Sequence, residues 1–355
     1  MTTKIEWSDE TWNPVVGCRR VSAGCEHCYA EVMAYRLEKM GQERYKGLTV
    51  LGKAGRRWSG GIRLVPEVLD KPLRWRKPRM VFVNSMSDLF HEAVPFEYIA
   101  AVFGVMASCP QHTFQVLTKR PHRMMQWFSW WATPHHQADL RGDALMKYNV
   151  GITEGLRLAI RGDNWPLPNV WLGVSCENQE TADDRIPLLL QCPAAVRWVS
   201  AEPLLGPIDF DPPRCDSCEA HDIAPGSAAG EAAWCLECDS EASFGHWMGD
   251  VDCEINWVVV GGESGRGARD CDVAWVRYIV DQCRAADVPV FVKQLGAVSV
   301  AHMAASSAEN GSWETPAIQR THRFHHPKGG NPEEWPEHLR VRQWPKCLYI
   351  GIRVG

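Results

Sequence analysis

Short apolar, β-branched segments alternate with amphipathic stretches along most of this chain. The apolar runs predict strands at 80–84, 113–117, 170–174, 196–200, 256–260 and 289–293, with an earlier one near 13–17. The stretches between them predict helices at 29–40, 96–108, 121–131, 179–191 and 273–286. Apolar strands separated by helices are typical of a parallel sheet covered by helices. The pattern therefore predicts an α/β fold, a partial or complete TIM-like (β/α) barrel, with an open doubly wound sheet as the alternative.

Polar side chains directly follow most of these strands. They are Ser87, Asp88, Lys119, Arg120, Ser175, Glu177, Glu202, Lys293 and Gln294, with Cys176 and the pair Gly261 and Gly262 at equivalent positions. In a barrel, the carboxyl ends of the parallel strands meet at one face, and active sites are built there. Ser, Asp and Asn also begin helices as N-caps. Glu, Lys and Arg do not, so the set as a whole predicts a functional site.

Composition and hydropathy indicate the cellular compartment in which this protein is expected. Of its 355 residues, 45% are hydrophobic and 23% are charged, which is a globular balance. No apolar run approaches the roughly 18 residues that span a bilayer, and the polar N-terminus lacks the apolar core of a signal peptide. We therefore expect a cytoplasmic protein without a membrane partner. In that reducing compartment its 14 cysteines are metal ligands, catalytic thiols or core residues rather than a disulfide framework.

Charge divides the chain unevenly. Residues 215–256 contain ten acidic residues and no Lys or Arg, so the remainder of the −5 chain carries a net charge of +5. We expect a barrel built from 1–206 and 256–304, an acidic insertion at 207–255 and a C-terminal extension at 305–355. A mildly basic body is compatible with a polyanionic substrate.

The first cysteine cluster is Cys18, Cys25 and Cys28, spaced C-x6-C-x2-C in a loop before a predicted helix. Three thiolates on one loop can hold three irons of a [4Fe–4S] cluster and leave the fourth iron without a protein ligand. A zinc ion would need a fourth ligand, and His27 is poorly placed to share a metal with Cys28. Structural or zinc-binding cysteines remain the alternative.

Several motifs resemble, in order, a phage-associated, radical-SAM-like family whose function is largely unassigned. The opening is Trp12-Asn13-Pro14-x-x-Gly17-Cys18 and then Gly24-Cys25-x-x-Cys28-Tyr29-Ala30. Further matches are at 85–90, 117–121, 173–175, 200–204, 261–265 and 293–294. The resemblance implies a barrel of the radical SAM type with a [4Fe–4S] cluster on Cys18, Cys25 and Cys28. The usual radical SAM spacing is C-x3-C-x2-C, and the longer first gap here departs from it.

The resemblance also implies roles for the residues after the strands. S-adenosylmethionine would bind the open iron, and its reductive cleavage would give a 5′-deoxyadenosyl radical, with a flavodoxin- or ferredoxin-type electron donor. Cofactor contacts would come from Ser87, Asp88, Ser175, Glu177, Glu202, Gly261 and Gly262. Lys119, Arg120, Lys293 and Gln294 would face the substrate. Cys176 would donate a hydrogen atom to a substrate radical, unless it is a small buried residue.

The second cysteine cluster lies in the acidic insertion. Cys215, Cys218, Cys235 and Cys238 have the C-x2-C-x16-C-x2-C spacing of a structural zinc ribbon. Four thiolates complete a tetrahedron, so the spacing predicts a zinc-ribbon-like module that folds around its metal. A second iron–sulfur cluster is the alternative.

Basic residues alternate with tryptophan at 71–79 and at 56–58, a pattern that suits phosphates and stacked bases but also fits a solvated loop. With the phage association, this favours a modified pyrimidine base or nucleotide of phage DNA as the substrate, with side-chain rearrangement or C–C bond formation. A radical SAM DNA-repair lyase is the second hypothesis. A non-catalytic, zinc-stabilised module that binds nucleic acid or regulates is the third.

Overall fold

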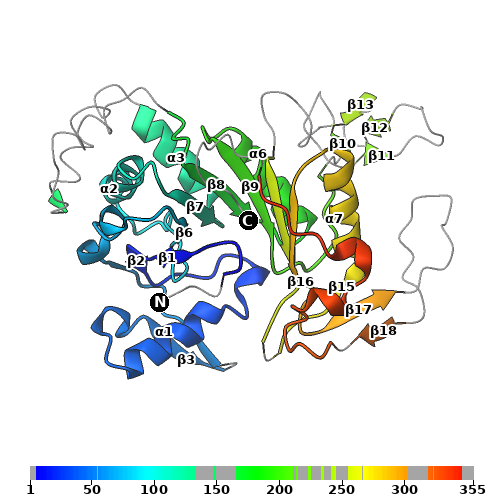
Figure 1. The fold of residues 1–355 in the computed structure, drawn as a ribbon, viewed down its shortest axis with the longest axis horizontal. Coiled ribbons are helices and arrows are strands. Elements are labelled where there is room, and N and C mark those ends of the chain that lie inside the picture. The colour runs from blue at the N-terminus through cyan, green and yellow to red at the C-terminus, as the bar shows by residue number, and fades with distance from the viewer. Residues whose placement is uncertain are drawn as a thin grey trace.

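The centre of the molecule is a parallel sheet that curls into a half-barrel (Figure 1). The computed structural model describes residues 5–53, 55–132, 147–148, 165–210, 255–265, 267–302, 319–322 and 324–345, with four short strands between 213 and 244. The seven strands of the half-barrel are β1 (Glu10–Trp12), β6 (Met80–Val83), β7 (Thr113–Thr118), β8 (Val170–Ser175), β9 (Val196–Ala201), β14 (Trp257–Gly261) and β16 (Val290–Gln294). Their order in the sheet follows the chain. A doubly wound sheet reverses its strand order, so that alternative is wrong.

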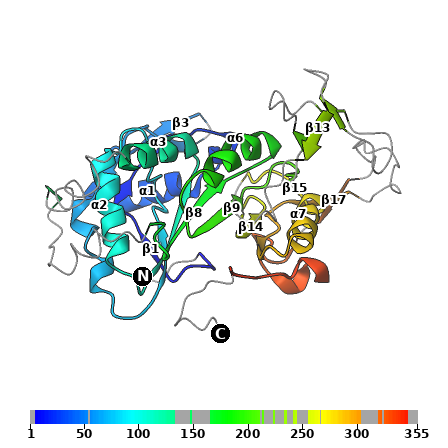
Figure 2. The same cartoon turned by 90° about the horizontal axis from the view of Figure 1, so that it is seen from above.

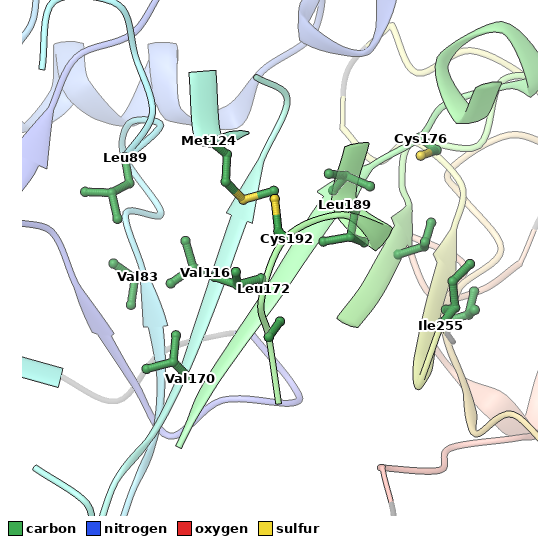
Figure 3. Packing of buried hydrophobic residues seen from close by; sticks show 14 of the residues in the cluster. Val83, Leu89, Val116, Met124, Val170, Leu172, Cys176, Leu189, Cys192 and Ile255 are labelled. Carbon is green, nitrogen blue, oxygen red and sulfur yellow. The ribbon is translucent and has the colours of Figure 1, made fainter. Parts of the chain in front are cut away.

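Helices cover the outer face of the half-barrel. They are α2 (Phe96–Ala107), α3 (Pro121–Ala132), α6 (Gln179–Leu190) and α7 (Val273–Ala285). Alternate strand residues such as Val83, Val116 and Leu172 belong to one hydrophobic core with Met124 of α3 and Leu189 of α6, and Figure 3 labels all five. The continuous apolar character of the strands follows because their opposite face is buried as well.

Aromatic side chains fill the inner face at the amino end of the strands. This second core contains Trp7, Phe82, Trp171, Trp198, Val196, Trp257, Val259 and Phe291. Trp7, which precedes β1, contacts the rings of Trp257 and Phe291 edge-on, with centroids 6.4 and 5.7 Å away. The N-terminal segment therefore packs across the inside of the half-barrel against its last two strands.

Smaller elements surround the half-barrel. Helix α1 (Tyr29–Lys39) packs against the hairpin of β3 (Thr49–Gly52) and β4 (Gly55–Trp58). β2 (Val15–Val16) pairs with β5 (Arg63–Leu64), and a three-stranded sheet contains β15 (Cys271–Asp272), β17 (Ser299–His302) and β18 (Gln319–His322). In the acidic insertion, β10 (Pro213–Arg214), β11 (Ile223–Ala224), β12 (Ala233–Cys235) and β13 (Glu241–Phe244) form an antiparallel sheet on the α7 side (Figure 2). Short 3-10 helices lie at 23–25, 43–45, 66–68, 72–74, 332–334 and 337–339.

The predicted elements match the observed ones closely. The strands and helices predicted from residue 29 onward agree with the structure to within one residue at each end. The early strand is a correction, because the sheet strand is Glu10–Trp12, and Val15–Val16 pairs with β5 outside the sheet. Pro14 has no N–H to give to a strand ladder, so the chain leaves the sheet before it. No helix in the described ranges is long and apolar enough to cross a membrane.

Candidate functional site

The three N-terminal cysteines lie on one loop, residues 17–28, between β2 and α1, which we call the cysteine loop. Gly17 begins it with φ +89°, and a β-carbon there would lie 2.4 Å from the carbonyl oxygen of Gly61. Asn13 fixes the adjoining turn, because its Oδ1 accepts hydrogen bonds from Ser85 Oγ (3.2 Å) and Met86 N (3.0 Å). The Trp-Asn-Pro motif and Gly17 thus hold the loop at the carboxyl end of β6.

Residues after other strands anchor the rest of the cysteine loop. After β7, Arg120 Nη2 donates to the carbonyl oxygen of Arg19 at 2.9 Å, and its Nη1 lies 3.8 Å from Cys18 Sγ. After β8, Glu177 accepts a hydrogen bond from Ser22 Oγ at 3.0 Å. After β14, Glu263 Oε2 lies 2.8 Å from His27 Nδ1. The carboxyl ends of the parallel strands therefore converge on this loop, as the sequence predicted.

The three thiols lie near one another and are partly buried. Burial, followed by the charge of Asp88, raises the pKa of the Cys18 thiol to about 12. Burial also raises the pKa of Cys28. Cys18 and Cys28 both pack against the small core that contains Val16, Ala30 and Ala34. Metal binding would have to deprotonate these desolvated thiols.

The cysteine loop carries three free thiols that could serve as metal ligands. Within the described ranges, no three Cys, His, Asp or Glu side chains are arranged to hold one metal ion. His27, the nearest imidazole in sequence, is engaged with Glu263 through Nδ1. A cluster binds each thiolate through a different iron, so its ligands need not meet at a single point. The loop therefore provides three thiols for three irons of such a cluster, while a structural zinc would need a fourth donor, and Glu26 and His27 of the loop contact Arg269 and Glu263.

Glu177 is buried at the centre of an ionic group after β8. Its carboxylate binds Lys119 Nζ and Arg185 Nη1, the latter at 3.1 Å. Burial opposes its charge, but Lys119 and Arg185 outweigh burial and hold the pKa of Glu177 below its usual range. A β-carbon on Gly24 would lie 2.3 Å from Glu177 Oε1. The glycine before Cys25 is therefore required by Glu177, whose predicted role was cofactor binding.

Asp88 is likewise fully engaged by the protein. Its carboxylate accepts hydrogen bonds from Thr118 Oγ1 (2.8 Å), the backbone N–H of Lys119 (3.0 Å) and Arg120 Nη1 (3.0 Å). Ser87, also a predicted cofactor contact, donates its hydroxyl to the carbonyl oxygen of Val15 at 2.7 Å. Asp88 thus positions Arg120, a predicted substrate contact that is only 6% exposed, and both residues support the cysteine loop.

Small and polar side chains replace the aromatics on the inner face toward the carboxyl ends of the strands. By strand alternation, Ser175, Ser200 and Gly261 follow the aromatic residues Trp171, Trp198 and Trp257 on that face. Beyond them, Lys293 Nζ donates to Glu202 Oε1 at 2.5 Å and lies 4.9 Å from the ring centroid of Trp7. Sequence reasoning had named Ser175, Glu202, Gly261 and Lys293, and it missed Ser200.

The glycine pair after β14 has a packing role. A β-carbon on Gly262 would lie 2.6 Å from the carbonyl oxygen of Leu295, so only glycine fits there. Gln294, predicted to face the substrate, is buried and donates its Nε2 to the carbonyl oxygen of Gly262 at 2.8 Å. Gly261 has more room, since the nearest atom to its β-carbon would be the Gln294 carbonyl oxygen at 3.3 Å. Gln294 and Gly262 therefore hold the ends of β14 and β16 together.

Sequence reasoning missed the most extensive ionic contact of the cysteine loop. Glu263 accepts hydrogen bonds from the Nη2 (2.7 Å), the Nε (3.0 Å) and the backbone N–H (2.8 Å) of Arg269. It also contacts His27. Although burial opposes its charge, these hydrogen bonds lower the pKa of Glu263 to about 2. Arg269 also reaches Glu26 of the loop at 3.3 Å. Only the matched segment Gly262-Glu263-Ser264 carried a signal for this contact, and Arg269 carried none.

The remaining predicted residues have other surroundings. Cys176 is completely buried in the core under the helices (Figure 3), and burial raises the pKa of its thiol, which favours the core interpretation. The side chains of Cys215, Cys218, Cys235 and Cys238 lie outside the described residues, so the zinc site stays a prediction.

The basic stretch 71–79 lies at the amino ends of the strands, opposite the cysteine loop. Arg79 and Lys71 pair with Glu10, at 3.1 and 3.7 Å, and Arg74 pairs with Asp70 at 2.8 Å. Trp75 is partly buried against the core. Two carboxylates thus pair with three of the five basic residues of this stretch, while Arg76 and Lys77 are exposed.

Comparison with known proteins identifies one relationship. No curated protein and no solved structure matches this chain. A family model described as "Protein of unknown function (DUF5131)" matches residues 2–321, which is most of the chain. The protein therefore belongs to the DUF5131 family.

Proposed function

We propose that this protein is a radical SAM enzyme with a [4Fe–4S] cluster on Cys18, Cys25 and Cys28. The observation that carries the proposal is the convergence of the cysteine loop, with its three thiols, and the polar carboxyl ends of β6, β7, β8 and β14. When bound, the cluster supplies one electron to S-adenosylmethionine, which yields methionine and a 5′-deoxyadenosyl radical. A reduced flavodoxin or ferredoxin would supply that electron.

The protein's own residues would divide into two groups. Arg120, Glu177 and Glu263 hold the cysteine loop in place, and Arg120 also directs an N–H toward the sulfur of Cys18. Hydrogen bonds to a ligand sulfur tune a cluster. Ser175 and Glu202 are the polar groups we assign to S-adenosylmethionine. Gly261 leaves room for the adenine to approach the backbone.

The half-barrel supports this assignment. Its strands follow the chain in order, and its polar residues lie at one end above an aromatic core. Barrel enzymes place their chemistry at that end. We therefore take the half-barrel to be the partial barrel of the radical SAM type. The substrate we propose is a modified pyrimidine base or nucleotide of phage DNA.

Release of 5′-deoxyadenosine tests the proposal directly. The full chain would be reconstituted anaerobically with iron and sulfide, reduced with dithionite and given S-adenosylmethionine. We expect a brown protein that releases 5′-deoxyadenosine, and a Cys28→Ala variant that does neither. Cys109→Ala removes a buried core thiol outside the loop and should keep both properties.

Other outcomes identify the alternatives. A protein that holds iron but releases no 5′-deoxyadenosine would refute the enzyme proposal and leave an electron-transfer or sensing cluster. A colourless protein that holds only zinc would favour the nucleic-acid-binding or regulatory module. In the repair-lyase hypothesis Cys176 donates the hydrogen atom, so Cys176→Ala should redirect the products.

We further propose a structural zinc on Cys215, Cys218, Cys235 and Cys238. The support is their spacing, which is that of a zinc ribbon. Metal analysis should find one zinc per chain in the wild type and none in a Cys215→Ser/Cys235→Ser variant, with iron content unchanged. Equal loss of iron in that variant would contradict separate sites.

A further inference from the structure

Exposed apolar side chains gather beside the cysteine loop. Every large hydrophobic side chain that is exposed in the described residues lies between positions 21 and 51: Val21, Tyr29, Val32, Met33, Met40, Val50 and Leu51. Tyr29, Val32, Met33 and Met40 follow the spacing of one helical face along α1 and its end. Leu51, 75% exposed, lies near the tip of the β3–β4 hairpin, which packs on α1. A concentrated exposed patch of this kind marks an interaction surface.

The same elements carry a strong positive charge. Residues 29–63 contain eight Lys and Arg but three Glu. Four exposed basic residues, Arg36, Lys39, Lys53 and Arg57, form no ion pair with any side chain that the structure describes. Two of the three glutamates form ion pairs, Glu31 with Arg20 and Glu43 with Lys46, and Glu38 accepts a hydrogen bond from the backbone N–H of Gly47. We call these four basic residues, with Tyr29, Val32, Met33, Met40 and Leu51, the α1–hairpin surface.

The hairpin geometry places apolar and basic groups side by side. Val50 pairs across the hairpin with Arg57, and Leu51 pairs with Arg56. Arg56 lies over the ring of Tyr35 in α1, 3.8 Å from its centroid, which fixes the hairpin on the helix. Leu51 is exposed near the tip of the hairpin, while Val50 and Arg57 are exposed on the opposite face of the hairpin. Exposed apolar and basic side chains therefore lie close together on this hairpin.

One end of the α1–hairpin surface reaches the carboxyl ends of the strands. Tyr29 directly follows Cys28, and its hydroxyl donates to the carbonyl oxygen of Ser85, after β6, at 2.6 Å. Because the Tyr29 side chain is 60% exposed, its ring is available to stack with a base at the entrance to the proposed site.

We infer that the α1–hairpin surface binds a single strand of DNA and leads one base toward the cysteine loop. Phosphates match the unpaired cations, and base faces match the exposed apolar side chains. A second copy of this chain would bring like charges together, which disfavours self-association through this surface. An enzyme that acts on a base must take the base out of the stack. This inference therefore rests on the proposed function, and it describes how the protein would bind its substrate.

Salt-dependent DNA binding tests the inference. A fluorescent single-stranded oligonucleotide would be titrated with the full chain at several salt concentrations, and Kd followed by anisotropy. Each lost phosphate contact reduces the slope of log K against log salt by about 0.7 for single strands. Lys53→Gln/Arg57→Gln should therefore weaken binding and reduce that slope by about 1.4. Tyr29→Ala should raise Kd about fivefold or more at an unchanged slope, since stacking does not release counterions.

A matched control removes two charges from the other end of the molecule. Arg76 and Lys77 are exposed residues of the stretch 71–79 at the amino ends of the strands, and Arg76→Gln/Lys77→Gln should change neither Kd nor slope appreciably. If the control loses as much affinity as Lys53→Gln/Arg57→Gln, or if the latter binds like the wild type, the inference is overturned. An oligomer that Leu51→Ser dissociates, with Kd for DNA unchanged, would overturn it in favour of self-association.

A second readout separates this inference from the proposed enzyme activity. Release of 5′-deoxyadenosine without any DNA reports on the cluster and S-adenosylmethionine alone. DNA binding with the expected variant effects but no release would support the surface and refute the enzyme. Release without salt-dependent DNA binding would support the enzyme and refute the surface.

Discussion

Glu177 at the end of β8 fills the space in which a side chain at position 24 of the cysteine loop would lie. A β-carbon on Gly24 would come within 2.3 Å of Glu177 Oε1 and 2.5 Å of its Cγ. Glu177 cannot give way easily, because Lys119, Arg185 and Ser22 all bind its carboxylate. This contact makes the position of Cys25 depend on an ionic group assembled from β7, β8 and α6.

We expect Gly24→Ala to disturb the cysteine loop more than the fold. The added methyl group must displace either the loop or the buried carboxylate, so iron incorporation should fall severalfold. Iron content per chain after anaerobic reconstitution measures this. Gly61→Ala is the matched control, since the nearest atom to its β-carbon would be Ser59 Oγ at 3.4 Å. Equal iron content in both variants would contradict the contact.

Glu263→Gln should destabilise the protein and loosen the loop. The lowering of the Glu263 pKa from 4.5 to about 2 corresponds to roughly 3 kcal/mol of stabilisation at neutral pH. A group whose pKa is lowered in the folded state stabilises the fold at pH values above its ordinary pKa. This stabilisation is lost as the pH falls toward the folded-state pKa. The difference in free energy of unfolding between wild type and variant should therefore be constant above about pH 5.5 and shrink from pH 4.5 downward.

Urea unfolding at a series of pH values measures that difference. Asp281→Asn serves as a control, because Asp281 forms only an exposed pair with Arg284 at 3.8 Å. Such surface pairs contribute about 0.5 kcal/mol or less. A Glu263→Gln effect that is as small as the control's, or that grows on acidification, would refute the assigned charge state.

The Glu202–Lys293 pair should matter more for activity than for stability. Both side chains are about one-fifth exposed, at 18% and 22%, so their pairing stabilises the fold only modestly. Lys293→Met keeps the length of the side chain but leaves the Glu202 carboxylate without its cation. If this carboxylate orients a ligand, 5′-deoxyadenosine release should fall about tenfold or more, the effect of losing one charged hydrogen bond. An unchanged rate would remove the pair from the site.

The close packing of Gly173 against Trp198 on the inner face should affect the stability of the core. A β-carbon on Gly173 of β8 would lie 2.5 Å from the indole ring of Trp198 on β9. Gly173→Ala should therefore lower the free energy of unfolding by about 1–3 kcal/mol, the range for overpacking a core. Combining it with Trp198→Phe should cost less than the sum of the two single changes. Additive effects in urea unfolding would show that the two positions do not share that space.

The elements of the half-barrel could be predicted from local sequence alone. Apolar runs such as 170–174 and 196–200 are buried on both faces, and helices of about three turns separate them. The exception near residues 13–17 arises because Pro14 ends the strand early. Strand ends also predicted which polar residues would converge, because all the strands are parallel and ordered along the chain.

The sequence could not predict which polar residue meets which. Glu177, Asp88 and Gln294 follow strands in the same way as Glu202 and Lys293. In the structure, the first three are occupied by partners within the protein, and the last two meet at the open end of the inner face. Periodicity gives the face of a strand, but it gives no information on contacts between residues more than a hundred positions apart, such as Arg120 with Cys18.

The surface charges also show which features the sequence could predict and which depend on tertiary contacts. From the sequence, the basic and aromatic residues at 71–79 and 56–58 could equally be a nucleic-acid-binding pattern or a solvated loop. Tertiary structure distinguishes them, because Glu10 and Asp70 pair with three basic residues of 71–79 at the amino ends of the strands. In the hairpin, Arg56 lies over Tyr35 of α1 and Arg57 is exposed without an ion pair among the described side chains. The sequence by itself determined the strands, the helices and the cysteine spacing, since these are local. Only the tertiary structure decided which charges remain unpaired and where they face, because that depends on partners brought together by folding.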